Sequence, residues 1–336
     1  MTPKRCIIPV FVPHLGCINN CVFCNQRSIS GQMEPATEKT VVNAISEGLS
    51  KLPEGASAQL AFYGGSFTAI PEERQNRLLA AAAPFLKSGE ICSVRLSTRP
   101  DAVDEGILRR LKSFGVATIE LGSQSMCDDV LEASGRGHTA GDTERAAGLI
   151  KAEGFELILQ MMTGLPGDTR EKAVRTAEKI IALKPDGVRI YPTVIVEDTP
   201  LCDMWRRGEY AEHRVSDAVS WCAELVPLFD AAGIPIIRLG LNPSEELSGG
   251  GALGGAYHPA LGELVRSRVL LNTARELLSK SALPEKTALL INPAQVSMLI
   301  GQHRENIEKL KVEFSLKEIK IRPADLPKGR IELAEH

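Results

Sequence analysis

The chain has 336 residues, of which 43% are hydrophobic and 24% are charged, so it has globular composition with room for one large domain and a smaller region. This composition excludes disordered and collagen-like chains. The formal net charge of −3 argues against a uniformly basic surface that coats DNA. The first 13 residues hold an apolar run too short for a secretory signal, and no stretch reaches membrane-spanning length, so we expect a cytoplasmic protein without a membrane partner.

From residue 5 to about residue 240, short apolar runs alternate with amphipathic stretches, which is typical of a parallel α/β fold. The predicted strands are Ile7–Val12, Leu60–Tyr63, Val94–Thr98, Thr118–Gly122, Leu157–Met162 and Val188–Tyr191, with a seventh candidate at Ile234–Leu239. Helices are predicted over residues 38–52, 102–114 and 169–183, after the capping residues Thr37, Asp101 and Asp168. We therefore predict an α/β fold with a partial (β/α)6 TIM-like barrel and a smaller α+β region at the C-terminal end.

Three cysteines, Cys17, Cys21 and Cys24, follow the first predicted strand with the spacing Cys-x3-Cys-x2-Cys. Three thiolates from one loop can hold three irons of a [4Fe-4S] cluster and leave the fourth iron open. A structural zinc site, with His14 as a fourth ligand, is the alternative. Because the sequence has no second Cys-x-x-Cys pair or matching His pair, the iron–sulfur interpretation is favoured.

Polar or glycine-rich clusters follow five of the predicted strands. They are Tyr63-Gly64-Gly65-Ser66, Ser97-Thr98-Arg99-Pro100-Asp101, Gly122-Ser123-Gln124-Ser125, Met162-Thr163-Gly164-Leu165-Pro166-Gly167 and Tyr191-Pro192-Thr193. The carboxyl ends of parallel barrel strands share one rim, and ligands bind there. Glycines allow a ligand to approach the backbone closely. The clusters therefore predict one ligand site at the rim that carries the cysteine loop.

Longer phrases identify a family. They are Tyr63-Gly-Gly-Ser-Phe-Thr, Thr98-Arg-Pro-Asp, Ile119-Glu-Leu-Gly-Ser-Gln-Ser, Arg136-Gly-His-Thr, Met161-Met-Thr-Gly-Leu-Pro-Gly, Val188-Arg-Ile-Tyr-Pro-Thr and Tyr257-His-Pro-Ala-Leu-Gly-Glu-Leu-Val. Together with the cysteine loop they resemble the radical S-adenosylmethionine (SAM) superfamily, and in particular the radical SAM domain of the Elongator catalytic subunit. The resemblance implies a [4Fe-4S] cluster on Cys17, Cys21 and Cys24. It also implies that SAM binds near Tyr63, Gly64, Gly65, Ser66, Arg99, Gln124 and Gln160.

The resemblance to the Elongator subunit is not uniform along the chain. The spacing between the first two cysteines is the compact one of the wider superfamily, whereas Elongator subunits have a longer gap. The chain is also expected to lack the acetyltransferase domain that follows the radical SAM domain in Elongator. The product of this chain need not be the Elongator product.

The C-terminal part is predicted to form separate regions. We divide the chain into a partial barrel (1–240), a helical connector (241–283) and a small α+β module (284–336). The order of predicted elements, with a last strand at Val312–Phe314, resembles a KH RNA-binding module, but Arg304 stands in place of the second glycine of the GXXG turn. Basic residues there alternate with acidic ones, which is typical of a solvated face: Arg304, Lys309, Lys311, Lys317, Lys320 and Arg322 with Glu305, Glu308, Glu313 and Glu318.

The leading hypothesis is a radical SAM enzyme that cleaves SAM reductively and uses the resulting 5′-deoxyadenosyl radical to activate a C–H bond, with an RNA nucleoside as candidate substrate. One alternative is a small-molecule substrate, as in the coproporphyrinogen oxidase branch, and another is a non-enzymatic, zinc-stabilised RNA-binding module. Expected partners are an electron donor such as flavodoxin or ferredoxin, and RNA but not DNA. No catalytic residue is singled out, because Tyr191, Tyr257 and Cys202 are equally suited as hydrogen-atom donors.

Overall fold

The computed structural model describes residues 5–13, 15–17, 21–25, 36–243, 247–281 and 284–334. The chain divides into two compact units, which we call the barrel unit (residues 1–214 and 228–259) and the C-terminal unit (residues 215–227 and 260–336). Among the described residues, no helix is long and apolar enough to cross a membrane.

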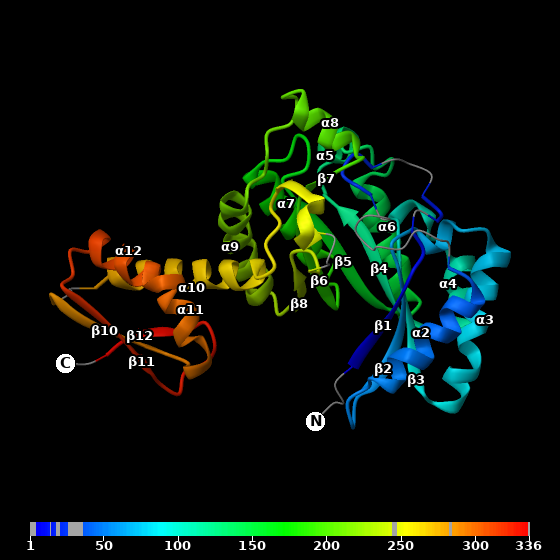
Figure 1. Ribbon diagram of the computed structural model, residues 1–336, viewed down its shortest axis with the longest axis horizontal. Coiled ribbons are helices and arrows are strands. Elements are labelled where there is room, and N and C mark those ends of the chain that lie inside the picture. Colours follow the sequence, from blue (N-terminus) through cyan, green and yellow to red (C-terminus); the bar gives the residue numbers. More distant parts are fainter. Residues whose placement is uncertain are drawn as a thin grey trace. The chain divides into compact units, whose positions relative to one another are not determined.

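The barrel unit is built on a sheet of seven parallel strands in the order β1-β2-β3-β4-β5-β6-β8, which curls into a half-barrel (Figure 1). The strands are β1 (Arg5–Phe11), β2 (Ser57–Tyr63), β3 (Ile91–Thr98), β4 (Val116–Gln124), β5 (Glu156–Thr163), β6 (Gly187–Pro192) and β8 (Ile236–Leu239). The predicted partial barrel is confirmed, and the seventh candidate strand is part of it. Strands β2 and β4 are buried along most of their length, as expected for parallel strands covered on both faces.

Helices follow the strands and cover the outer face of the curled sheet, because crossovers between parallel strands are right-handed (Figure 1). They are α2 (Glu38–Ser50), α3 (Glu72–Ser88), α4 (Glu105–Ser113), α6 (Ala140–Ala152) and α7 (Arg170–Ala182). Two shorter helices of the barrel unit are α5 (Asp128–Ala133) and α8 (Pro200–Arg206), and residues 215–227 of α9 (Val215–Ala231) belong to the C-terminal unit. A small antiparallel pair, β7 (Val194–Val196) and β9 (Ala252–Gly255), completes the barrel unit.

The helix caps are partly those predicted. Thr37 caps α2 with a capping box, as expected. The cap of α4 is Asp104 rather than Asp101, because a short 3-10 turn over Pro100–Ala102 precedes the helix. The cap of α7 is Thr169 rather than Asp168. The Asp168 carboxylate instead accepts the backbone N–H groups of Gly164 and Thr169, and burial raises its pKa to about 6.

The C-terminal unit contains α10 (Leu261–Ser279), β10 (Lys286–Ile291), α11 (Val296–Ile300), α12 (Glu305–Glu313), β11 (Glu318–Pro323) and β12 (Ile331–Leu333). Its three strands form a sheet in the order β11-β10-β12, with β11 parallel and β12 antiparallel to β10. Its core includes Leu270, Leu271, Leu289, Leu299, Leu310 and Ile319.

The predicted strand at Val312–Phe314 is wrong. Helix α12 continues to Glu313, and the N–H of Phe314 still donates to the Leu310 carbonyl oxygen (3.0 Å). Leu310 is fully buried and Phe314 packs against the same core, so helical spacing governs this stretch. The chain reverses at Ser315, which has a positive φ of 54°, and the strand begins only at Glu318.

Candidate active site at the barrel rim

The loop that follows β1 packs tightly against the loop that follows β2. The N–H of Val12 donates to the Tyr63 carbonyl oxygen (2.7 Å), and the N–H of Ser66 donates to the Leu15 carbonyl oxygen (2.9 Å). A Cβ atom on Gly65 would lie 2.6 Å from the Leu15 carbonyl oxygen and closer still to that of Val12. Glycine is therefore required at position 65, because two backbone segments meet there. This contact positions the beginning of the cysteine loop at the rim.

The three predicted cluster cysteines lie on this loop. Cys17 is exposed, whereas Cys21 and Cys24 are half-buried. Although the Cys17 side chain is exposed, partial loss of solvent around its thiol and the neighbouring Cys21 raise the pKa of that thiol, and Arg136 and Arg99 act in the opposite direction. Within the described ranges, no three His, Cys, Asp or Glu side chains lie close enough to hold a metal ion. His14, the fourth ligand of the zinc alternative, lies outside the described residues.

A buried arginine contacts the cysteine loop. Nη1 of Arg136 donates to the Cys21 sulfur (3.1 Å), and Nη2 donates to the Gly122 carbonyl oxygen (2.6 Å) at the end of β4. Arg99 supports it by donating to the Arg136 carbonyl oxygen (2.9 Å). Burial and the positive charge of Arg136 lower the pKa of His138 to about 4, so this imidazole is neutral at pH 7. In the sequence, the only signal for Arg136 is its place in the phrase Arg136-Gly-His-Thr, which does not indicate a contact with the cysteine loop.

Three of the predicted SAM-binding side chains lie on the rim. The Ser66 hydroxyl accepts the N–H of Arg99 (3.1 Å) and lies 3.2 Å from the Thr98 hydroxyl. The Arg99 guanidinium forms an ion pair with Asp101. Gln124 ends β4 with a positive φ of 62°, and its Oε1 atom is buried without a hydrogen-bond partner among the described residues. An acceptor left in this state costs free energy unless a ligand donates to it.

Two other predicted residues point into the lumen of the half-barrel. The Tyr63 hydroxyl donates to Oε1 of Glu120 (2.9 Å), and Nε2 of Gln160 donates to Oε2 of the same carboxylate (2.8 Å). Arg95 donates to Oε1 (2.8 Å), and Nε of Arg189 lies 2.8 Å from Oε2. The fully buried Glu120 carboxylate on β4 therefore bonds to side chains of β2, β3, β5 and β6.

This network shows how strongly the sheet curls. Nη2 of Arg189 on β6 lies 3.2 Å from the Tyr63 hydroxyl on β2, although four strand spacings in a flat sheet would separate these strands by about 19 Å. Burial alone would raise the pKa of Glu120, but the charges of Arg189 and Arg95 and their hydrogen bonds outweigh it and hold this pKa below its ordinary value. The same network raises the pKa of Tyr63 through burial and through the Glu120 charge.

Comparison with known families places this site in a class. The radical SAM superfamily model matches residues 11–180, and the model of the C-terminal domain of radical SAM proteins matches residues 185–270. The first match covers about half of the chain and contains the cysteine loop and four of the five strand-end clusters. The chain belongs to the radical SAM superfamily and is an enzyme of that class. Proteins of this superfamily bind a [4Fe-4S] cluster and SAM.

Individual relatives narrow the comparison. The tRNA uridine(34) acetyltransferase of Methanocaldococcus jannaschii is 27% identical over 268 residues, and human Elongator complex protein 3 is 27% identical over 266 residues. Each alignment covers 67% of this chain and 48% of the relative, so the chain spans about half the length of the curated relatives it matches. The resemblance to the Elongator radical SAM region is thus confirmed.

Solved structures share the fold. Elp3 of Methanocaldococcus infernus has a TM-score of 0.64 at 22% identity, covering 86% of this chain and 71% of that chain. Coproporphyrinogen III oxidase of Escherichia coli has a TM-score of 0.50 at 16% identity, covering 69% of this chain and 53% of that chain.

The donor groups at the rim have the chemistry that a cluster and SAM require, although the three thiols do not converge on one point among the described residues. Three thiols on one loop are suitable iron ligands, and Arg136 supplies a positive charge beside one of them. The partnerless Oε1 of Gln124 is an acceptor for a ligand hydroxyl or ammonium group. Gly65 has a separate reason to be glycine, and the amide nitrogen of Gln160 is already used by Glu120. The fit therefore depends on the thiols, Arg136 and Gln124.

We expect Glu120→Gln to destabilise the barrel by about 3–5 kcal/mol at pH 7, because among the described residues it leaves the buried Arg189 without an acidic partner and leaves Arg95 only the more distant Glu156 (3.7 Å). The folded protein keeps Glu120 ionised below its ordinary pKa of 4.5, so unfolding takes up a proton there. The excess stability of the wild type over the variant is then present at neutral pH and is lost as the pH falls below about 4.5. Urea denaturation from pH 3 to pH 8 measures both effects.

The matched control is Glu105→Gln, which removes a solvent-exposed pair with Arg109 on α4. Little change in the free energy of unfolding is expected from this substitution. Equal losses in the two variants would contradict the assigned role of the lumen network.

We expect Gly65→Ala to cost about 1–3 kcal/mol of unfolding free energy, since its Cβ would overlap backbone atoms of the cysteine loop. The amount of iron that Gly65→Ala retains after anaerobic reconstitution should also decrease, because the cysteine loop would be displaced. Gly148→Ala is the matched control: it lies within α6, its Cβ would meet no atom within 4 Å, and it should stabilise the protein by about 0.5–1 kcal/mol. A stable Gly65→Ala variant with normal iron content would refute the close-approach argument.

Proposed function

We propose that this protein holds a [4Fe-4S] cluster with Cys17, Cys21 and Cys24 and binds SAM at the barrel rim in order to abstract a hydrogen atom from an RNA nucleoside. The carrying observation is the cysteine loop seated beside Arg136, at the carboxyl ends of the strands, in a chain of the radical SAM superfamily. When bound, the [4Fe-4S] cluster would supply the reductive cleavage of SAM to methionine and a 5′-deoxyadenosyl radical.

The protein's own residues orient these groups. Arg136 donates to the Cys21 sulfur and also to the Gly122 carbonyl oxygen, so it ties the cysteine loop to the end of β4. The positive charges of Arg136 and Arg99 offset part of the rise in the pKa of the Cys17 thiol and so act in favour of the thiolate that would bind iron. Ser66, Arg99 and Gln124 form the adjacent part of the rim. The acceptor offered to SAM there is the Oε1 atom of Gln124.

The network of side chains bonded to Glu120 lines the lumen of the barrel behind the rim. Glu120 pairs with Arg95 and Arg189 and accepts a hydrogen bond from the Tyr63 hydroxyl, and Glu156 adds a second negative charge 3.7 Å from Arg95, so the polar side chains of the barrel wall are held in place. Tyr191 lies beside Arg189, with its hydroxyl 3.5 Å from Nη1, and burial raises its pKa. A rigid, water-poor wall protects a reactive radical from side reactions.

RNA is proposed as substrate because relatives over the radical SAM region include a tRNA uridine(34) acetyltransferase and Elongator complex protein 3. These relatives are about twice as long as the region matched, so their complete reactions are not carried over. The proposal also includes a protein electron donor of the flavodoxin or ferredoxin type and a cytoplasmic location. A small-molecule substrate is the competing outcome of the substrate experiment below.

The test of the cluster is anaerobic reconstitution with iron and sulfide. Wild type should bind roughly four irons per chain, lose visible absorbance with dithionite and cleave SAM after reduction. Cys21→Ala should lose the cluster and SAM cleavage while keeping the circular dichroism spectrum of the folded barrel. Cys92→Ala is the control, because Cys92 is an exposed thiol on β3 outside the rim. Stoichiometric zinc without SAM cleavage would overturn the proposal.

The test of the substrate uses deuterium-labelled RNA. Deuterium from total tRNA should appear in 5′-deoxyadenosine when the reduced enzyme is supplied with SAM. Transfer from a labelled metabolite extract, and none from tRNA, would instead identify a small-molecule substrate.

A further inference from the structure

Two of the three loop cysteines, Cys21 and Cys24, are joined by a backbone turn. The N–H of Cys24 donates to the Cys21 carbonyl oxygen (3.1 Å). A turn of this kind brings the backbone of its first and fourth residues close together. Contacts that fix this turn in the fold therefore also fix the positions of two cysteines.

The backbone of Val22, inside this turn, is hydrogen-bonded on both sides. Its N–H donates to the carbonyl oxygen of Ser134 (3.1 Å), just after α5, and its carbonyl oxygen accepts the N–H of Leu201 (2.8 Å) in the first turn of α8. Nδ2 of Asn25 donates to the carbonyl oxygen of Glu197 (3.2 Å), which lies between β7 and α8. Two of these three bonds come from the segment that begins α8.

Apolar packing connects the same parts of the chain. Val22 and Phe23 pack against a buried cluster on β7, α8 and the segment after α8, namely Ile195, Leu201, Cys202 and Tyr210. Phe23 also packs against a second buried cluster that includes Val130 and Leu165. The turn between Cys21 and Cys24 is therefore covered on the α8 side by buried apolar side chains.

Thr199 fixes the start of α8. Its hydroxyl accepts the N–H of Cys202 (3.2 Å) and donates to the Val196 carbonyl oxygen (2.6 Å) at the end of β7, and its side chain is buried. Both bonds would be lost in an alanine variant, and the first turn of the helix would be less stable. Because the Leu201 N–H belongs to that turn, Thr199 also determines how well Val22 is held.

We propose that α8 clamps the cysteine loop, with Thr199 and Leu201 as residues that position Cys21 and Cys24 for the cluster. This inference rests on the proposed function, because it takes these cysteines as iron ligands. The apolar cluster under α8 would also keep water away from one side of the bound cluster. A reduced cluster carries one more negative charge than an oxidised one, so shielding from water makes its reduction potential more negative.

The clamp comes from a different part of the chain than the loop it holds. The cysteine loop lies in the range 11–180 matched by the superfamily model, whereas α8 lies in the range 185–270 matched by the model of the C-terminal domain. The later part of the chain would thus contribute to the stability and redox potential of a cluster whose ligands lie near the amino end.

The experiment compares Thr199→Ala with Thr199→Ser in the full chain after anaerobic reconstitution. The rate at which an iron chelator removes iron and the midpoint potential, followed by electron paramagnetic resonance during a redox titration, are measured. Thr199→Ala should lose iron about fivefold faster, the factor that corresponds to the ~1 kcal/mol of one helix cap, and its potential should be less negative. Thr199→Ser keeps the hydroxyl and should lose iron within about twofold of the wild-type rate. An unchanged rate and potential in Thr199→Ala would overturn the clamp.

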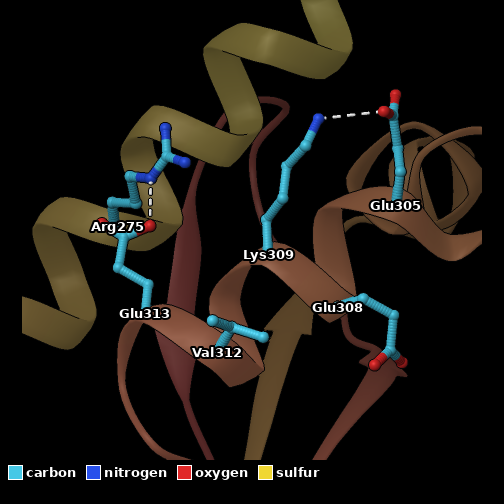
Figure 2. A pocket seen from close by; sticks show the side chains of 6 residues that line it. All are labelled: Arg275, Glu305, Glu308, Lys309, Val312 and Glu313. Atoms are coloured by element: carbon cyan, nitrogen blue, oxygen red, sulfur yellow. Dashed lines mark hydrogen bonds and ion pairs between the residues drawn. The ribbon is translucent and has the colours of Figure 1, made fainter.

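Two controls remove contacts of similar kind elsewhere. Asp104→Ala removes the cap of α4, where the carboxylate accepts the Ile107 N–H (2.8 Å). Arg275→Ala removes a contact between two helices of the C-terminal unit, where Arg275 of α10 pairs with Glu313 of α12 (2.7 Å) beside a hollow of about 530 Å³ (Figure 2). Both controls should release iron within about twofold of the wild-type rate and keep its potential. Iron release as fast as in Thr199→Ala from either control would overturn the proposal.

Hydrogen–deuterium exchange of the protein before reconstitution tests the clamp without the cluster. Peptides that contain Val22 and Leu201 should be protected in the wild type, and both should exchange faster in Thr199→Ala. Wild type that shows this coupled exchange but binds no iron would support the clamp and overturn the proposed function. Wild type that binds iron and cleaves SAM, with exchange unchanged in Thr199→Ala, would overturn the clamp and leave the proposed function standing.

Discussion

One buried carboxylate holds the inside of the barrel together. Glu120 on β4 bonds directly to four side chains from the two strands on each side of β4. They are Tyr63 on β2, Arg95 on β3, Gln160 on β5 and Arg189 on β6. These contacts span five consecutive strands and are possible only on the concave face of a strongly curled sheet. Glu120, with Glu156 3.7 Å from Arg95, balances the charge of the two buried arginines, and the contacts of Glu120 depend on the same curvature that places the strand ends on one rim.

The rim is organised by backbone contacts more than by side chains. The cysteine loop is docked on the Gly65–Ser66 turn through two backbone hydrogen bonds and a contact that excludes a Cβ atom. Arg136 then joins that loop to the end of β4. A loop positioned by a neighbouring strand end can present its side chains to a ligand held by the other strand ends, and ligand sites of barrel proteins lie at this rim for that reason.

In the C-terminal unit, too, the fold decides which charged side chains lie near one another. Acidic and basic residues alternate along the sequence of α12, but the helix turns one set toward α10 and another toward β11. The last predicted strand was wrong for a related reason. Helical spacing of Leu310 and Phe314 against the core outweighs the β propensity of Val312.

The sequence by itself determined the parallel barrel, the class of enzyme and the loop of Cys17, Cys21 and Cys24. Alternating periodicity, strand-end clusters and ligand spacing are local patterns that can be read along the chain. Only the tertiary structure decided that Arg136 contacts Cys21, that Glu120 pairs with two arginines and that Gly65 is a packing contact. The partners in these contacts are 115 residues apart for Arg136 and Cys21 and 69 for Arg189 and Glu120, so local spacing carries no information about them. They form because the curled sheet brings distant strands together, and that geometry is a property of the fold as a whole.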